Sequence, residues 1–190
     1  KYTAIARELR TEKQKVSNIN ENDIDVIGVA RSEFEVCIEI FFVRKSKMIG
    51  REHFFFTNLE DEEENQIVSE FVKQYYIGRE ILPQKIMMKE EIEEKHIIEE
   101  NLTKEAKRKV EIKTPQKGEK LRLVEMAERN ALITLENKYK ERYNVLSELK
   151  QFVIDAVGGY HKAVKFGLDK FEYVIEFFDN ELELIKSMFD

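Results

Sequence analysis

In the first part of the chain, apolar residues alternate with polar ones. The segment from Phe34 to Phe42 has an apolar side chain at every second position, and a short apolar run at 25–30 precedes it. A third strand is expected at 48–56, after the polar turn at 44–47. Because strands joined by such short turns pair antiparallel, the pattern predicts a three-stranded meander.

After residue 60 the spacing of apolar residues changes from two to three or four. An acidic segment at 60–64 precedes apolar positions at helical spacing from Ile67 to Tyr76, and acidic residues favour a helix amino terminus. Short strands and helices are then expected to alternate: strand 84–89, helix 92–102, strand 110–114 and a long helix from about Leu121. The order β-β-β-α-β-α-β-α predicts an α/β protein with a ribonuclease-H-like mixed sheet.

The end of the chain has apolar residues at intervals of four and three. Eight consecutive positions of this kind run from Val164 to Phe189, and a similar spacing runs from Leu135 to Val153. Two such seams, separated by two glycines at 158–159, predict an antiparallel helical hairpin. The seam positions that are candidates for binding a partner helix or a second copy are Phe171, Ile175, Phe178 and Leu182.

Composition narrows the class of protein. The 190 residues include 7 Gly and 2 Pro, which is too few for a turn-dense all-β fold. The 32 basic and 38 acidic residues give a net charge of −6, so contact with nucleic acid requires a local basic patch. The single cysteine, Cys37, fits a reducing cytoplasm. No apolar run is long enough for a membrane span and no signal peptide is visible, and a start at Lys1 suggests a fragment.

Carboxylates are missing from the positions at which a ribonuclease-H-type nuclease holds two metal ions. That chemistry requires acids inside the first and fourth strands, whereas the expected strand interiors, 26–30 and 85–88, carry none. Asp23 and Asp25 lie at the entrance of the first strand, where we interpret them as loop residues. None of the three histidines has a partner at metal-ligand spacing. The sequence therefore predicts no catalytic residue, no metal site and no cofactor.

Basic residues gather before the long helix. The segment 104–122 holds eight basic and three acidic residues, a net charge of +5 within an acidic chain. The loop at 115–118 leads into a helix amino terminus, whose free amides favour phosphate. Composition alone leaves two interpretations open, phosphate contact and a merely solvated basic surface. The candidate DNA-binding residues are Lys113, Lys117, Gly118, Lys120, Arg122, Arg129 and Asn130.

Several motifs resemble those of one family, in the same order. They are Asp23-Ile-Asp-Val-Ile-Gly-Val-Ala30, Phe71-Val-Lys-Gln-Tyr-Tyr76, Ile81-Leu-Pro83, Pro115-Gln-Lys-Gly-Glu-Lys120 and Leu123-Val-Glu-Met-Ala-Glu-Arg-Asn-Ala131. From about residue 16 to about residue 140, the chain resembles the central region of the UvrC subunit of the bacterial UvrABC excinuclease. Residues 3–15 also resemble the closing half of the UVR motif, which docks on UvrB in that family.

The resemblance implies a ribonuclease-H-like domain without an active site. The family cuts damaged DNA on both sides of a lesion in nucleotide excision repair, which implies the SOS response and, as partners, DNA, UvrB and the UvrA–UvrB–DNA complex. The family's GIY-YIG domain and its catalytic Asp-Ile-Ser-His strand have no counterpart here, and residues 150–190 do not fit the family pattern. Ser46 stands where the family usually has a turn glycine, and Lys117 where it usually has arginine.

We therefore expect three segments: a helix and linker at 1–20, a central ribonuclease-H-like domain at 21–137 and a helical hairpin tail at 138–190. The expected function is a non-catalytic scaffold and DNA-contacting module of a UvrC-type excision repair subunit. The alternative is a protein-interaction module that binds a partner helix, or itself, through the heptad tail. The missing strand carboxylates argue against a third possibility, an active nuclease.

Overall fold

The computed structural model describes residues 23–57, 62–156, 158–159 and 169–187. The helix and linker expected at 1–20 lie outside the described residues. The chain divides into two compact units, and the boundary falls between Leu132 and Ile133. The first unit contains the sheet and the second contains a helical hairpin.

The first unit is built on a five-stranded mixed sheet. Strands β1 (Asp23–Arg31), β2 (Glu35–Arg44) and β3 (Lys47–Thr57) form the expected antiparallel meander. Strands β4 (Lys85–Met87) and β5 (Glu111–Lys113) extend the sheet on the other side of β1, and both run parallel to it. The spatial order is β3-β2-β1-β4-β5, so the predicted ribonuclease-H-like fold class is confirmed.

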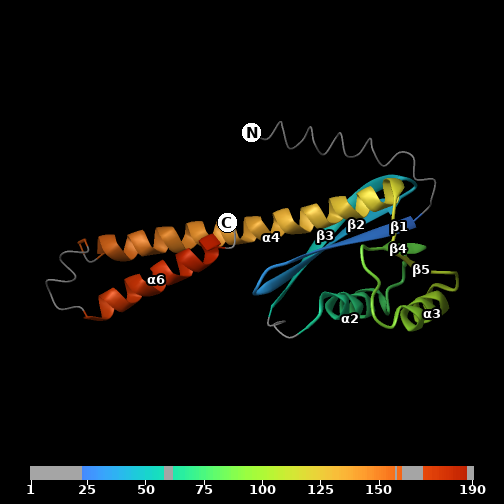
Figure 1. Ribbon diagram of the computed structural model, residues 1–190, viewed down its shortest axis with the longest axis horizontal. Helices are drawn as coiled ribbons and strands as arrows, with labels where there is room; N and C mark the ends of the chain where they lie inside the picture. The colour runs from blue at the N-terminus through green and yellow to red at the C-terminus, as the bar shows by residue number, and fades with distance from the viewer. Residues whose placement is uncertain (1–22, 58–61, 157, 160–168, 188–190) are drawn as a thin grey trace. The chain divides into compact units, whose positions relative to one another are not determined.

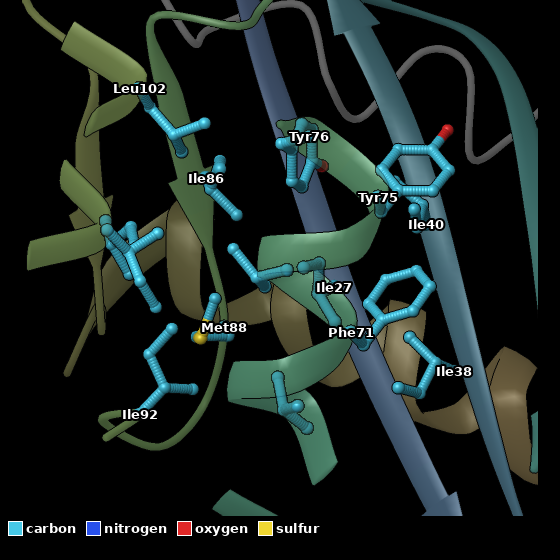
Figure 2. Close-up of a cluster of buried hydrophobic side chains, with 14 of the residues drawn as sticks. Ile27, Ile38, Ile40, Phe71, Tyr75, Tyr76, Ile86, Met88, Ile92 and Leu102 are labelled. Atoms are coloured by element: carbon cyan, nitrogen blue, oxygen red, sulfur yellow. The ribbon is translucent and has the colours of Figure 1, made fainter. Parts of the chain in front are cut away.

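Two helices cover one face of this sheet. They are α2 (Glu64–Tyr76) and α3 (Lys95–Ala106). Figure 2 shows Phe71 and Tyr75 of α2 lying against Ile38 and Ile40 of β2, within a cluster of buried apolar side chains. The apolar residues of α2 thus form one helix face that is buried on the sheet, as their spacing predicted.

The opposite face is covered by the first part of α4 (Gly118–Ala156), and the contact there is unusually close. A Cβ atom added to Gly28, in the middle of β1, would lie 2.1 Å from the carbonyl carbon of Ala127. Ala127 and Ala131 are both fully buried. Because Gly28 has no side chain and the helix presents alanine, the backbone of α4 rests directly on the strand.

The turn between β2 and β3 consists of Lys45 and Ser46, both with positive φ angles, 49° and 60°. Two consecutive residues of this kind make the tight hairpin turn that suits the twist of antiparallel strands. Glycine is the residue best adapted to such a position. The turn glycine that the resembled family usually has at position 46 thus has a direct structural reason.

Two expected boundaries were wrong. The apolar run predicted a first strand over 25–30, whereas β1 starts at Asp23 because its amino end pairs with the end of β2, Asp23 opposite Arg44. The helix expected from Ile92 starts at Lys95. Ile92 is nevertheless buried in the apolar cluster, so its side chain contributes to the core from the connection that precedes α3.

The second unit is the predicted helical hairpin. It is formed by the part of α4 after Leu132 and by α6 (Asp169–Ser187), and Figure 1 shows the two running side by side. Ile175 packs against Val153 and Ile154. At the end of α4, the amides of Gly158 and Gly159 donate to carbonyls of the last helical turn, and both glycines have positive φ angles. The two glycines thus end the first helix, as their position suggested.

Candidate functional site at the carboxyl edge of the sheet

The strands β1, β4 and β5 are parallel, so their carboxyl ends lie at one edge of the sheet, which we call the carboxyl edge. A ribonuclease-H-type nuclease would need metal-binding acids on the first and fourth strands. The corresponding inward positions here are apolar: Ile27 and Val29 of β1 and Met88 after β4. These three side chains line a small cavity of about 20 Å³, room for about one water molecule.

The rest of the lining is mixed and includes four charged residues, which are Glu64, Lys89, Glu90 and Glu128. The Lys89 ammonium lies 3.2 Å from the Glu128 carboxylate. The pKa of Glu64 is raised, first by burial and then by the neighbouring charges of Glu90 and Glu128. Lys89, together with Arg31 at the end of β1, therefore supplies positive charge near Glu64, and these acids come from the helices and a loop rather than from the two strands.

No group of three or more His, Cys, Asp or Glu side chains within the described part of the chain is arranged to hold a metal ion. The chemistry of the donor set agrees, because Val29 and Met88 supply no hard oxygen ligand and Lys89 repels a cation. The strand positions at this edge, Ile27, Val29 and Met88, therefore supply none of the paired oxygen ligands on which two-metal phosphodiester hydrolysis depends.

Strand β1 itself carries two carboxylates, Asp23 and Asp25, and the sequence interpretation of both as loop residues was wrong. Asp25 is a residue of β1 and is only 2% exposed. The Arg44 guanidinium lies 2.7 Å from one carboxylate oxygen, and the Tyr76 hydroxyl donates to the other at 3.0 Å. Burial raises the pKa of Asp25, while Arg44 opposes this rise.

Asp25 therefore has a structural role. Both of its carboxylate oxygens are engaged, and the two partners tie β1 to β2 and to α2. Its neighbour on β4 is Ile86, which offers no second ligand. No local pattern in the sequence indicates this network, because the arginine and the tyrosine are 19 and 51 residues away from Asp25.

The basic segment 104–122 does not form one patch. Lys104 and Lys107 lie at the end of α3, before β5 begins, and Arg108 donates to the carbonyl of Leu82. Lys109, two residues before β5, and Lys113 at its end both contact Glu111, and their ammonium groups lower the pKa of this carboxyl to about 2. Part of the net positive charge that the sequence suggested is thus neutralised locally.

The remaining candidates follow β5 at the carboxyl edge. Lys117 is exposed, and Gly118, with a φ angle of 77°, is the first residue of α4. Lys120 is half-buried in the first turn, and Arg122 is exposed. Lys113 pairs with Glu111 and is therefore set apart. The other four predicted residues, Lys117, Gly118, Lys120 and Arg122, lie together in the loop and at the start of α4.

The last two candidates lie further along α4 and differ from each other. Arg129 is exposed. It lies seven residues after Arg122, so both side chains occupy one helix face, about 10 Å apart along the axis. Asn130 instead accepts a hydrogen bond from Arg51 of β3 at 3.0 Å and donates to the carbonyl of Met126. It is therefore better explained as a link between α4 and the sheet than as a DNA ligand.

The partner-binding candidates of the tail are placed within the hairpin. Ile175 is buried, and Phe178 and Leu182 are half-buried. The side chain of Phe171 lies outside the described residues. Because Ile175 already packs against α4, the predicted seam holds the two helices of one chain together.

The family model described as "UvrC Ribonuclease H-like domain" matches residues 23–138. This range includes the whole sheet, the helices on both of its faces and the carboxyl edge. The chain therefore belongs to the UvrC ribonuclease-H-like domain family, as the resemblance of its motifs indicated.

Three relatives named "UvrABC system protein C" illustrate the similarity. The one from Alkaliphilus oremlandii (strain OhILAs) is 42% identical over 66% of this chain, and that from Acetivibrio thermocellus is 45% identical over 69%. The one from Clostridium perfringens (strain ATCC 13124 / Type A) is 37% identical over 92% of the chain. The chain spans 20%, 21% and 27% of the length of these relatives, respectively.

One expectation about the tail needs correction. Residues 150–190 were expected not to fit the family pattern, but an alignment over 92% of a chain of 190 residues necessarily includes part of this segment. The proposed division into 21–137 and 138–190 stays a prediction.

Among solved structures, the ribonuclease H2 from Pyrococcus horikoshii OT3 aligns with a TM-score of 0.37 and 13% identity, over 83% of this chain and 99% of that one. The strand order and the family model, rather than this likeness, carry the assignment of the fold. Within the described residues, no helix is both long enough and apolar enough to cross a bilayer.

Proposed function

We propose that this chain is a non-catalytic, DNA-contacting scaffold module of a UvrC-type nucleotide excision repair subunit. Its partners are DNA, through phosphate contacts, and UvrB and the UvrA–UvrB–DNA complex, which the family implies. Its compartment is the cytoplasm. The observation that carries the proposal is the carboxyl edge of the sheet, where apolar strand residues and Lys89 replace metal ligands while exposed basic residues lie nearby on the β5–α4 loop.

The non-catalytic part of the proposal follows from the donor set. Phosphodiester hydrolysis of the ribonuclease-H type needs carboxylates that converge on two metal ions from adjacent strands. At this edge the two strands supply Val29 and Met88, and the buried Asp25 is already paired with Arg44 and Tyr76. A domain of this kind can hold neighbouring parts of a repair complex without cutting DNA.

The DNA-contacting part follows from the geometry of the loop that precedes α4. Lys117 and Arg122 are exposed there, and the first amides of α4 favour an anion such as phosphate. Such contacts attract any sequence of DNA, because contacts to phosphate carry no information about the bases. We expect weak binding with a clear dependence on salt, despite the net charge of −6.

The test is a binding series on duplex DNA at several salt concentrations. The variant changes Lys117, Lys120 and Arg122 to Ala together. If each makes one phosphate contact, the slope of log affinity against log salt falls in magnitude by roughly 2.7. The matched control changes Lys104, Lys107 and Lys109 to Ala, which removes the same charge from the same basic segment, but from the part that precedes β5.

The two variants separate a local contact from general electrostatic attraction. A loss of affinity and slope in the loop variant only supports the proposal. An equal loss in both variants would show that the loop is not a specific contact, and an unchanged slope in the loop variant would remove it from the DNA interface. Binding of the parent chain that does not depend on salt would contradict phosphate contact altogether.

The alternative function, binding of a partner helix through the heptad seam, has less support. The seam residue Ile175 is buried against α4 of the same chain. A partner would have to open the hairpin to reach this seam.

A further inference from the structure

The helical hairpin has a second set of apolar residues that its own packing does not bury. On α4 these are Val145, Leu149 and Phe152, and on α6 they are Val174, Phe177 and Leu184. Their exposed fractions range from 41% to 70%. The residues beside them in sequence face inward: Val153 contacts α6, and Ile175 and Ile185 are buried.

These six side chains lie on one face of the hairpin. Arg142 of α4 and Glu181 of α6 form an ion pair at 2.7 Å. The pair shows that the helix face of α4 that carries Arg142 and the helix face of α6 that carries Glu181 lie on the same side of the hairpin. On α4 the three apolar residues follow Arg142 at helical spacings of 3, 7 and 10, and on α6 they lie 7 and 4 residues before Glu181 and 3 after it. Residues at such spacings share a helix face, so both sets lie on the side of the Arg142–Glu181 pair.

The other side of the hairpin is polar. Lys150 and Asp179 form an ion pair there, and a shallow groove is lined by Lys140, Tyr143, Asn144 and Lys186. The hairpin as a whole is therefore amphipathic. Its seam holds the two helices together, one side meets water, and the other side presents an apolar surface, which we call the outer apolar face.

The outer apolar face is self-complementary along its length. The packing of Ile175 against Ile154 and the Lys150–Asp179 pair give the same antiparallel register of the helices. In this register the Arg142–Glu181 pair joins positions six residues apart along the axis, so it does not set the levels. Val145 lies five residues before Lys150 and Leu184 five residues after Asp179, so these two side chains lie at the same level. By the same register, Phe152 lies level with Phe177.

A second copy, turned by a two-fold axis parallel to the helices, would place α6 of one chain opposite α4 of the other. Val145 then faces the Leu184 position of the second copy, and Phe152 faces its Phe177 position. Every neighbouring pair of helices in the resulting four-helix bundle is antiparallel, which is a standard arrangement for such bundles.

The exposed area is of the size that such an interface needs. The six side chains together expose on the order of 500 Å² of apolar surface, at the upper end for a patch on a monomer. With a polar rim it approaches the roughly 800 Å² that each partner buries in a standard interface. Phe152 and Phe177 lie near the centre, where aromatic residues contribute most to binding.

We propose that the outer apolar face is a homodimer interface, in which the hairpins of two copies form an antiparallel four-helix bundle. This interface differs from the predicted seam of Ile175, Phe178 and Leu182, which serves the fold of the single chain. The proposal does not depend on DNA binding.

Sedimentation of the chain over a range of concentrations tests this proposal. We expect a monomer–dimer equilibrium in the parent chain, and for Phe177→Glu a dimer dissociation constant raised at least about 10-fold, because a charge would be buried against an aromatic side chain. The matched control is Ile81→Glu, which changes an 80% exposed isoleucine of the sheet unit and should leave dimerisation unchanged. Circular dichroism checks that both variants keep their helices.

Cross-linking tests the register. The Val145→Cys chain mixed with the Leu184→Cys chain should form a disulfide between copies, whereas the Val145→Cys chain mixed with the Phe177→Cys chain should not, because seven residues displace the sulfurs by about 10 Å. The native Cys37 is fully buried in the sheet and does not compete.

The proposal is overturned by a parent chain that stays monomeric at high micromolar concentration, or by a dimer that Phe177→Glu leaves intact. A cross-link that forms only in the mismatched pair would overturn the two-fold arrangement.

Discussion

At the scale of single residues, Gly28 is the position that most constrains the fold. The backbone of α4 occupies the space that any Cβ atom would need, at 2.1 Å from the Ala127 carbonyl carbon. Gly28→Ala should therefore force the helix away from the sheet and reduce the free energy of unfolding by at least about 3 kcal/mol. Urea denaturation measures this change.

Gly50 provides the matched control. A Cβ atom there would meet only the side chain of Phe42, at 3.7 Å. Gly50→Ala should alter stability by less than about 0.5 kcal/mol. If both substitutions have the same effect, close approach of helix and strand is not the reason for the glycine at position 28.

Tyr76 tests the network around the buried Asp25. Tyr76→Phe removes the hydroxyl that donates to this carboxylate and should cost about 2 kcal/mol near neutral pH, since the bond is made to a charged group. The variant raises the folded-state pKa of Asp25 further above 3.8. The loss of stability in Tyr76→Phe should therefore be complete above the folded-state pKa of Asp25 in the variant. It should shrink as the pH falls through that pKa, because the carboxyl is then protonated in both proteins.

Thermal unfolding of both proteins across a pH series measures this difference. Tyr75→Phe is the control, because the Tyr75 hydroxyl donates to the exposed Glu52 instead. Its cost should be smaller and should change less with pH. A pH-independent loss in Tyr76→Phe would mean that the carboxylate of Asp25 does not need this hydroxyl.

These residue-scale features were the hardest to predict from the sequence. Asp25 resembles a loop residue because it stands at the very start of the apolar run 25–30 that locates the strand. Its partners come from β2 and α2, and no local spacing indicates either contact. A glycine inside an apolar strand does indicate close approach, but only the structure shows that Ala127 is the group that approaches.

At the scale of elements, the start of α2 meets the end of β4 at a cluster of acids around one lysine. The pKa of Glu64 is raised mainly by burial. For an acid with a raised folded-state pKa, stability decreases as the pH rises from the ordinary value of 4.5 through the folded value. Glu64→Gln removes this contribution, so the variant should be more stable near neutral pH and no more stable below pH 4.5.

The expected gain is only about 0.5 kcal/mol, because water partly screens the charge. Chemical denaturation at two pH values measures it, and Glu63→Gln, one residue earlier and exposed, is the control. A gain that is equal at both pH values would contradict an origin in the charge of Glu64.

The elements themselves were largely predictable, because alternation and helical spacing depend on residues close together in sequence. The meander, the helices and the hairpin were all found in this way. The parallel pairing of β4 and β5 was expected from analogy only, since strands of three residues contain too little pattern to define a partner. The second apolar stripe of the hairpin was missed because most of its residues, such as Phe177, adjoin an apolar residue that is at least half-buried.

At the scale of the whole molecule, we predict that this chain does not incise DNA by itself. Incubated with damaged duplex, UvrA, UvrB and Mg²⁺ or Mn²⁺, it should produce no metal-dependent cut, because the carboxyl edge lacks the strand carboxylates of a two-metal site. Incision is followed on a labelled duplex. Cutting that persists in preparations of the Gly28→Ala control with disrupted packing would indicate a contaminant, whereas cutting that requires the folded chain would contradict the prediction.

The ion pair between Lys89 and Glu128 has a consequence for experiments on complete repair complexes. Lys89 is part of the polypeptide, unlike a bound metal ion. Its positive charge therefore cannot exchange with the buffer or be removed by a chelator. The fold of this domain should thus be indifferent to EDTA, and its thermal midpoint should be the same with or without divalent ions. Any effect of chelation on a reconstituted complex that contains this domain can then be attributed to another component.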